Sequence, residues 1–414
     1  MPHGAESRMK NVWLVVLSSE PDTDHIVAAV SKSLSRGQNI HFVVRGGLTR
    51  TMNSRLDVLR SFGNFTVTVS KIYKPRLGKW NRFLRVAHCK FLVNRWLQRN
   101  NIALVLLEWG TGIANSQRHS RASWIGHLFR DYSSQIQHVA QHLGIPVVAL
   151  PHGHALLSKS LEFTGKHAAE VARDHGGRLP FSDRESFAAY VVAHETDKRY
   201  LLGRTDMRGT NIRVLGSARF SPDWINRLYS KTSPSDLFSS ESLTRVLFFL
   251  PKWNAWINRE AVISLLLSLA SLKEIELVVA EHPRRGASEL THGERQLIQS
   301  AGTVNFSSPG TDSIALIKAC DCLIDISSSI VLDAVVLGKR LVMPRYLQSA
   351  VAETRLDESS LPVRTYDVES TIRAICSGNP TPQLDAHFVS EILAQPSSET
   401  LNNYDRLFQS LERR

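Results

Sequence analysis

A run of three serines follows a short apolar segment near the end of the chain. Residues 323–326 have the composition of a buried strand, and they lead into Ser327, Ser328 and Ser329 before a helical apolar pattern begins. The first N–H groups of a helix are unpaired and carry partial positive charge, so hydroxyls there either help to hold a phosphate or cap the helix. Both interpretations stay open for the serines taken alone.

A histidine and an arginine follow a second apolar segment, residues 275–280. After one glutamate come His282, Pro283 and Arg284. Arginine pairs with phosphate in a bidentate way, and a histidine here could donate to a phosphate oxygen or protonate a leaving group. Pro283 stiffens the turn. The alternative is a solvated loop.

The first half of the chain repeats this arrangement. The segment "IPVVALP" is followed directly by His152 and Gly153. A glycine at this position lets the backbone come close to a ligand. One such histidine could simply pack against the edge of a sheet. Two histidines at strand ends in the two halves favour a chemical role.

The elements that must position these residues are short β-branched segments that alternate with longer helical patterns, which is typical of parallel strands joined by helical crossovers. Strands are predicted at 12–18, 40–46, 65–70, 102–109, 145–152, 188–194, 212–216, 245–251, 275–283, 303–307, 322–327 and 340–344. The prediction is an α/β protein with two doubly wound Rossmann-like domains that face a central cleft. Such sheets bind ligands at the carboxyl ends of their strands.

The domain boundary is predicted at a Ser- and Pro-rich stretch, residues 230–242, which suits a linker. Residues 1–232 then form an N-terminal domain and residues 243–385 a second domain. Residues 386–414 form a helical segment that could return to the first domain.

The composition of the chain limits the classes of partner and compartment but does not identify one function. The chain has 414 residues, is 43% hydrophobic, and carries 50 Lys and Arg against 38 Asp and Glu, a formal net charge of +12. This surplus favours anionic partners. The four cysteines lack zinc-type spacing and fit a reducing compartment. Apolar runs are too short for a signal peptide or a membrane span, so we expect a cytoplasmic protein, peripheral at the inner face of the membrane if associated with it.

The C-terminal motifs resemble those of a known group of enzymes. "ELVVAEHPRRG" and "DSIALIKACDCLIDISSSIVLDAVVLGKRLVMP" are similar to the second half of GT-B transferases, in particular CDP-glycerol glycerophosphotransferase-like enzymes and capsule or lipopolysaccharide glycosyltransferases. The resemblance implies that His282 with Pro283 and the three serines bind donor phosphates. It also implies that residues 1–232 form the acceptor-side domain and residues 243–385 the nucleotide-donor-binding domain. His152 then serves catalysis or the acceptor, and Gly216 and Arg219 align with a Gly-x-x-Arg stretch before the second domain.

The chain also departs from the glycerophosphotransferases. It has Pro-His-Gly-His in the first domain, and Lys252-Trp253 stands where a Thr-Trp-Arg ending is more common. Glycerol phosphate as the transferred group is therefore in question. Relatives that use CMP-linked sugars carry an acidic residue after an early strand as general base, and Glu108 occupies such a place. Its alternative is an acid in a polar loop.

Three further features of the sequence are weaker indications of function. Asp22 and Asp24 have the spacing of a metal-binding Asp-x-Asp, but they follow the first strand, where such residues most often cap a helix. Asp333 could orient a serine, although a solvent-facing position is expected. Residues 78–100 are basic with an apolar stripe of Trp80, Phe83, Leu84, Ala87 and Phe91, which predicts either a crossover helix packed on the sheet or a surface helix that contacts anionic lipid.

The leading hypothesis is a metal-independent enzyme without a cofactor, which moves a sugar or polyol phosphate from a CMP-, CDP- or UDP-linked donor to a polysaccharide or lipid-linked acceptor. Ser327 to Ser329, His282 and Lys252 would hold the leaving phosphate, and His152 or Glu108 would take the acceptor proton. The first alternative is a non-hydrolysing nucleotide-sugar 2-epimerase. A nucleic-acid-binding protein is the second, but no helix-turn-helix, zinc or aromatic-interleaved motif appears, so no nucleic acid is expected as partner.

Overall fold

A computed structural model describes residues 11–17, 20–45, 47–70, 91–108, 132–151, 187–204, 209–251, 253, 257–281, 290–308, 310–326, 328–348, 361–377, 388–394 and 396–412. The chain divides into two compact units. Unit 1 comprises residues 1–154, 164–227 and 396–414, and unit 2 comprises residues 155–163 and 228–395.

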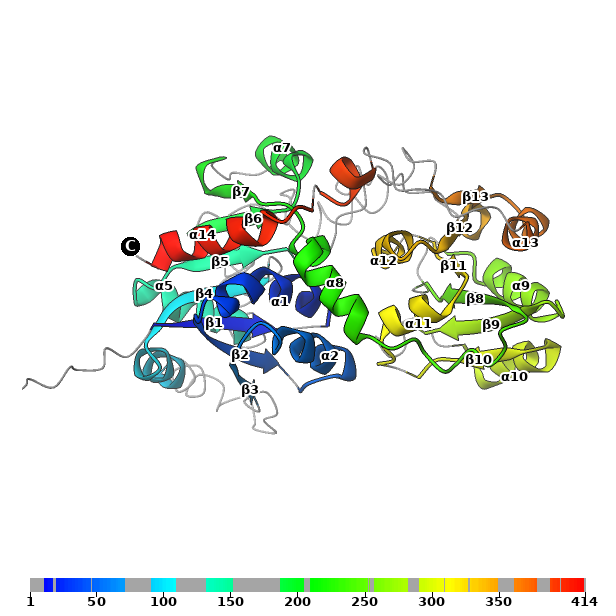
Figure 1. Ribbon diagram of the computed structural model, residues 1–414, viewed down its shortest axis with the longest axis horizontal. Coiled ribbons are helices and arrows are strands. Elements are labelled where there is room, and N and C mark those ends of the chain that lie inside the picture. Colours follow the sequence, from blue (N-terminus) through cyan, green and yellow to red (C-terminus); the bar gives the residue numbers. More distant parts are fainter. Residues whose placement is uncertain are drawn as a thin grey trace, which may run out of the picture. The chain divides into compact units, whose positions relative to one another are not determined.

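Unit 1 is built on a sheet of seven parallel strands in the order β3-β2-β1-β4-β5-β6-β7 (Figure 1). Its strands are β1 (Val12–Leu17), β2 (Asn39–Arg45), β3 (Thr66–Ser70), β4 (Ile102–Glu108), β5 (Val147–Leu150), β6 (Ala189–Val192) and β7 (Ile212–Val214). Its helices are α1 (Glu20–Ser35), α2 (Arg50–Leu59), α5 (Tyr132–His142), α7 (Glu195–Arg204), the first part of α8 (Pro222–Lys231) and α14 (Thr400–Glu412), with a short 3-10 helix at Ala218–Phe220.

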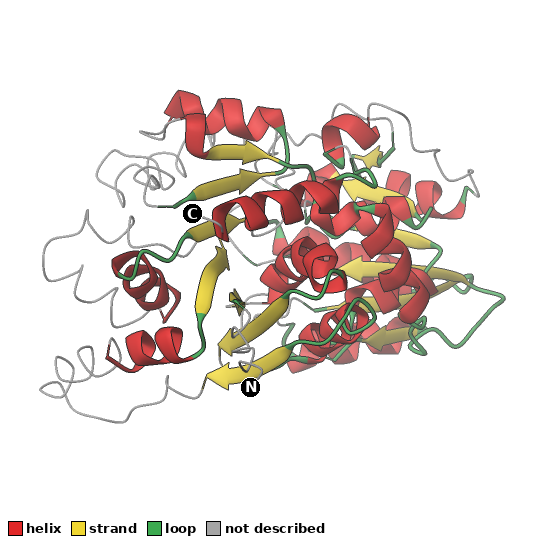
Figure 2. Ribbon diagram, turned by 60° about the vertical axis from the view of Figure 1, so that its left-hand side comes forward, coloured by secondary structure: helices red, strands yellow, loops and turns green. Residues whose placement is uncertain are grey.

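Both faces of this sheet are covered by helices, which is why its strands read as nearly continuous apolar runs (Figure 2). Leu14 and Val16 belong to a core that includes Val93 and Leu97 of the helical residues 91–99 and residues of α5. Trp13, whose side chain points to the opposite face because strand side chains alternate, meets Phe408 of α14 with 5.6 Å between ring centroids. The sheet is therefore the middle layer of three.

The C-terminal helix α14 packs against α1 in unit 1. The Ser33 hydroxyl donates to Asp405 Oδ1 at 2.7 Å, Arg36 pairs with the same carboxylate, and the Tyr404 hydroxyl donates to the carbonyl of Gly216 at 3.0 Å. Gly216 has a φ of +81°, a left-handed conformation that favours glycine. The last residues of the chain thus help to hold the turn that follows β7.

Unit 2 contains a second parallel sheet in the order β10-β9-β8-β11-β12-β13. Its strands are β8 (Thr244–Phe249), β9 (Ile275–Ala280), β10 (Val304–Phe306), β11 (Cys322–Ile324), β12 (Arg340–Pro344) and β13 (Val363–Thr365). Its helices are α9 (Arg259–Ala270), α10 (His292–Ala301), α11 (Ser313–Ala319), α12 (Val331–Val336) and α13 (Val368–Cys376), with a 3-10 turn at Arg345–Leu347 and a π-helical turn at Phe388–Ile392.

Local signals explain where these helices begin. Asn258 caps α9 by accepting from the N–H of Ala261 at 3.1 Å, and Thr291 and Glu294 form a reciprocal capping box at the start of α10. Cys320 and Cys322 are buried and serve as small apolar residues of the core, and burial raises the pKa of the Cys320 thiol to about 12.

The Ser- and Pro-rich stretch after α8 runs along unit 2. The backbone N–H groups of Ser239 and Ser240 donate to the two carboxylate oxygens of Glu276, at 2.8 and 3.0 Å, and the Ser239 hydroxyl adds a third bond at 2.8 Å. Burial by itself raises the pKa of Glu276, but these hydrogen bonds outweigh it and lower the pKa. Glu276 therefore anchors this stretch to β9.

The doubly wound α/β fold class is confirmed, and every strand predicted from the sequence is present. Among the strands of the described ranges, β13 alone was not predicted, because three residues with one buried side chain give no apolar run. Within the described ranges, no helix is both long and apolar enough to cross a membrane.

Candidate active site

The order of the strands in unit 2 marks one edge of its sheet as the place to look for a ligand. The strand order reverses between β8 and β11, which lie side by side in register, Phe248 opposite Ile324. In such sheets the connections leave the carboxyl ends of the two strands in opposite directions, so a crevice opens there. The residues directly after β8, β11 and β12 are therefore the first candidates.

The serine-rich loop after β11 is held by an aspartate that was not among the residues predicted for the site. Asp325, which is almost fully buried, accepts the backbone N–H of Ser328 at Oδ1 (2.7 Å) and the Ser328 hydroxyl at Oδ2 (2.8 Å). Ser328 itself is exposed. A buried carboxylate thus holds the turn while the serine stays accessible, and Ser327 lies outside the described residues.

The helix-cap interpretation does not apply to Ser328. The helix α12 has Ile330 at its N-cap position, and no side chain makes a capping hydrogen bond there. Ser328 and Ser329 contribute only their carbonyls, which accept from Val331 and Leu332 at 3.3 Å. The hydroxyl of Ser328 is used to fix the loop instead.

Asp333 corrects a second expectation, since a solvent-facing position is wrong. Its side chain is fully buried, and it accepts from the Tyr229 hydroxyl at 3.2 Å. The reason is that α12 is short and five of its six residues are buried, Asp333 among them. An acidic side chain at this position of the helix is therefore buried with its neighbours.

Trp253, which follows β8, is contacted by an arginine at the face of its ring. The guanidinium of Arg259 lies 4.7 Å from the centre of the Trp253 ring and makes two contacts with the Glu294 carboxylate, at 2.6 and 3.3 Å. Trp253 is thus fixed in place at the switch point. Its neighbour Lys252, a predicted phosphate ligand, lies outside the described residues.

The strand β9 ends in a similar anchor. Glu281, whose side chain is largely buried, forms an ion pair with Arg295 of α10 at 2.5 Å. The next residues, His282, Pro283 and Arg284, lie outside the described residues, so their predicted contact with donor phosphate stays a prediction.

Arg345 is a further candidate for the site, and it was not predicted from the sequence. It directly follows β12, and it is buried. Because Val342 pairs with Ile324, Arg345 lies beyond the same sheet edge as the loop of Ser328. Burial, and then the nearby charge of Arg364, lower the pKa of Arg345. A buried guanidinium next to a second arginine is suited to an anionic ligand. Its position immediately after an apolar strand was the signal that could have found it.

In unit 1, Glu108 is placed at the corresponding edge. It is the last residue of β4, beside the switch point between β1 and β4, and its side chain is buried at 9% exposure. Glu108 pairs in register with Leu150 of β5, two residues before His152 in the sequence. His152 itself lies outside the described residues. Glu108 is therefore a strand-end carboxylate rather than an acid in a polar loop.

Arg219 lies in a buried ion cluster of unit 1. Its guanidinium is 3.7 Å from Asp24 Oδ2, and Arg55 Nε donates to Asp24 Oδ1 at 2.7 Å. Burial alone raises the pKa of Asp24, but Arg219 and Arg55 together lower it from 3.8 to about 2. The cluster ties α1, α2 and the 3-10 helix together, and a donor-binding role for Arg219 stays a prediction.

The same cluster bears on the Asp-x-Asp motif. Asp24 lies within α1, which begins at Glu20, so it does not cap the first helix as expected. Its carboxylate is engaged by two arginines, which compete with a cation. The side chain of Asp22 is outside the described set. In the part of the chain that the structure describes, no group of three His, Cys, Asp or Glu could hold a metal ion.

Known proteins with a similar fold were found among solved structures only. No family model matches the chain, and no curated protein matches it. The UDP-GlcNAc 2-epimerase from Neisseria meningitidis, solved with bound UDP-GlcNAc, is similar at 12% identity, with a TM-score of 0.55, over 97% of this chain and 99% of that chain.

Two further solved structures agree. The Methanocaldococcus jannaschii UDP-GlcNAc 2-epimerase, in complex with UDP-GlcNAc and UDP, has 11% identity and a TM-score of 0.53, covering 96% of this chain and 99% of its own. The UDP-N-acetylglucosamine 2-epimerase from Rickettsia bellii has 14% identity and a TM-score of 0.53, with coverages of 98% and 96%. Over nearly its whole length the chain therefore has the GT-B fold.

Proposed function

We propose that this chain is an enzyme that acts on a nucleotide-activated sugar and binds the nucleotide diphosphate at the carboxyl edge of the unit 2 sheet. The observation that carries this proposal is the loop of Asp325 and Ser328 at the β8/β11 switch point, with buried Arg345 beyond the same edge. The GT-B fold, shared with structures named for bound UDP-GlcNAc and UDP, supports the same ligand class.

The proposed reaction is inversion at C2 of a UDP-linked sugar, as in the proteins to which the fold is similar. A C2 proton is not acidic on its own. If the bond from C1 to the diphosphate breaks as the C2 proton is removed, the C–H electron pair forms a C1–C2 double bond and the diphosphate leaves with its own pair. Re-addition of the diphosphate and of a proton from the other face completes the inversion.

The residues divide this chemistry between them. Glu108, buried at the end of β4, is the proposed base for the C2 proton, with His152 as the second proton carrier. Arg345 and the predicted ligands His282, Arg284 and Lys252 would stabilise the charge that grows on the leaving diphosphate. Ser328 donates with both its hydroxyl and its N–H to Asp325, so its proposed role is to hold the loop around the diphosphate in shape.

A second candidate reaction, transfer to a surface-polysaccharide or lipid-linked acceptor, is supported by the sequence motifs. His282-Pro283 and the three serines resemble donor-phosphate motifs of CDP-glycerol glycerophosphotransferase-like enzymes and of capsule or lipopolysaccharide glycosyltransferases. Both reactions need the same stabilised leaving phosphate. They differ in whether the sugar leaves the nucleotide for good.

Incubation of the enzyme with UDP-GlcNAc in D₂O, followed by NMR, separates the two reactions. The epimerase predicts UDP-ManNAc and deuterium at C2 without any acceptor. The transferase predicts no exchange, and nucleotide release only when acceptor is present. A thermal-shift series with UDP, CMP, CDP and GDP identifies the base. If none of these nucleotides raises the melting temperature and no turnover is seen, the proposal is wrong.

A further inference from the structure

The positive charge of the chain is concentrated in one region. Between Asp57 and Glu108, residues 58–107 contain ten basic residues and no Asp or Glu, a net charge of +10 in a chain whose total is +12. The ten are Arg60, Lys71, Lys74, Arg76, Lys79, Arg82, Arg85, Lys90, Arg95 and Arg99. This concentration favours a partner with an extended anionic surface.

The described part of this region presents apolar and basic side chains together. In the helical residues 91–99, Val93 and Leu97 lie in the core of unit 1, one helical turn apart. Phe91 is 58% exposed and Leu92 40% exposed. Phe91, which belongs to the apolar stripe predicted from the sequence, is thus not packed on the sheet, because Val93 and Leu97 take the sheet-facing side.

Two arginines share the exposed side of this helix. Arg95 is four residues after Phe91 and three after Leu92, and Arg99 is four further on, so these side chains lie along one stripe. Both arginines are exposed. No acidic residue occurs in residues 91–99 or in α5, which packs beside them.

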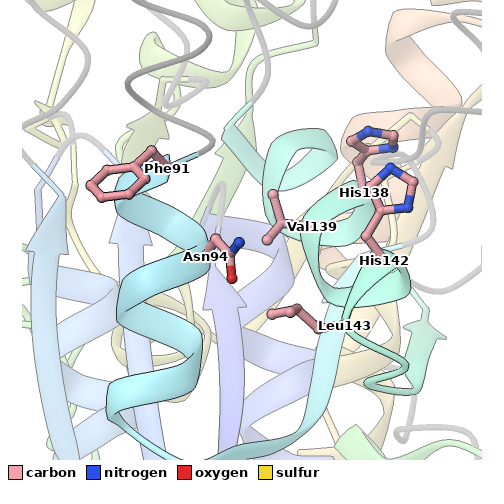
Figure 3. A pocket seen from close by; sticks show the side chains of 6 residues that line it. All are labelled: Phe91, Asn94, His138, Val139, His142 and Leu143. Carbon is pink, nitrogen blue, oxygen red and sulfur yellow. The ribbon is translucent and has the colours of Figure 1, made fainter.

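A shallow hollow of about 170 Å³ lies beside these residues, where the helical residues 91–99 meet α5. Phe91 and Asn94 line it from one helix, and Val139 and His142 line it from α5 (Figure 3). The imidazole rings of His138 and His142 lie 4.3 Å apart at its rim. The lining is largely apolar and carries no acid.

We propose that Phe91, Leu92, Arg95 and Arg99, with the hollow beside them, form a docking surface for an anionic lipid membrane. Exposed aromatic and aliphatic side chains next to arginines match the boundary between lipid headgroups and acyl chains, where the apolar groups insert and the arginines pair with phosphates. A nucleic acid would use the arginines but has no need for exposed Phe91 and Leu92. This inference is independent of the proposed function.

Cosedimentation with vesicles tests the proposal. Wild-type protein should bind vesicles of equal parts phosphatidylcholine and phosphatidylglycerol at low salt, bind more weakly at high salt, and ignore phosphatidylcholine alone. Each basic residue near an anionic surface strengthens binding about fivefold. The Arg95→Glu/Arg99→Glu variant should therefore lose about twentyfold or more in partition coefficient.

Two further variants sharpen the test. Phe91→Ser/Leu92→Ser keeps every charge and should weaken vesicle binding severalfold. Arg373→Glu/Arg406→Glu makes the same change of charge at exposed arginines elsewhere and should bind like the wild type. All of these side chains are exposed, so thermal unfolding should change by no more than the small contribution of exposed ion pairs.

Three outcomes would overturn the proposal. Wild-type protein could stay in the supernatant with anionic vesicles at low salt. The Arg373/Arg406 control could lose as much binding as the Arg95/Arg99 variant, which would show attraction by net charge alone. Random-sequence duplex DNA could be bound through Arg95 and Arg99, with no effect of Phe91 and Leu92 on either ligand, which would show a nucleic-acid surface.

Discussion

The Ser328 hydroxyl donates to the Asp325 carboxylate at 2.8 Å, and the Ser328 backbone N–H donates to the other oxygen of the same carboxylate at 2.7 Å. The aspartate is buried and the serine is exposed. The loop that follows β11 is therefore set in shape before any ligand arrives, and such preorganisation strengthens ligand binding.

Replacing Ser328 by alanine should weaken UDP binding by about fivefold to tenfold, because the loop loses one of its two hydrogen bonds to Asp325 and has to be ordered when the ligand binds, at a cost of about 1 kcal/mol. The fold should be nearly unaffected, because the backbone N–H of residue 328 still donates to Asp325. Isothermal titration with UDP measures the change. Ser370→Ala, which breaks the capping box of α13, is the matched control: it should lower stability and leave the UDP affinity unchanged.

Arg345 and Arg340 stand at opposite ends of β12 and provide a second comparison. Arg345→Gln should weaken UDP binding by about tenfold or more, because the substitution removes the buried guanidinium that is proposed to pair with the diphosphate at the carboxyl edge of the sheet. Arg340 donates to the carbonyls of Ala374 and Ile375 at the amino end, so Arg340→Gln should reduce stability only. Equal UDP affinities of the Arg345 variant and the wild type would remove Arg345 from the site.

The Asp24 cluster predicts a particular dependence of stability on pH. The pKa of Asp24 is lowered from 3.8 to about 2, so its charged form stabilises the folded state by about 2 kcal/mol at every pH above about 4. This contribution is lost as the pH falls from about 4 towards 2. The wild type should exceed Asp24→Asn in free energy of unfolding at pH 7 by about 2 kcal/mol or more, with the gap closing near pH 2.

Urea titrations at a series of pH values measure this gap. Asp57→Asn is the control, because the ion pair of Asp57 with Arg60 is exposed and should contribute less than about 1 kcal/mol at any pH. A gap for Asp24→Asn that does not change between pH 7 and pH 2 would contradict the assignment of a lowered pKa.

Glu108→Gln should cut turnover by on the order of a hundredfold or more while UDP affinity stays unchanged, because the amide has the shape of the carboxylate but cannot take a proton. Rates of C2 deuterium exchange and of product formation measure the loss. Glu276→Gln is the control: it removes a buried carboxylate that serves only to anchor residues 239 and 240, so it should lower stability without slowing turnover per folded molecule. Normal turnover of Glu108→Gln would exclude Glu108 as the base.

The sequence by itself determined the order of strands and helices and which residues follow each strand. Both are local properties, since a run such as residues 275–280 is apolar whether or not the chain has folded. That is why the fold class and the positions of Glu108 and the serine loop could be predicted, and why β13, which has no apolar run, could not.

Only the tertiary structure decided the partners and the exposure of these residues. Asp325 holds Ser328, Asp333 is buried against Tyr229, Arg219 meets Asp24, and Phe91 faces outward. Arg219 and Asp24 are separated by nearly two hundred residues, and Asp333 and Tyr229 by about a hundred, so no spacing rule relates them. Burial and pairing at such separations depend on how whole elements pack, which is a property of the folded chain and not of any segment of it.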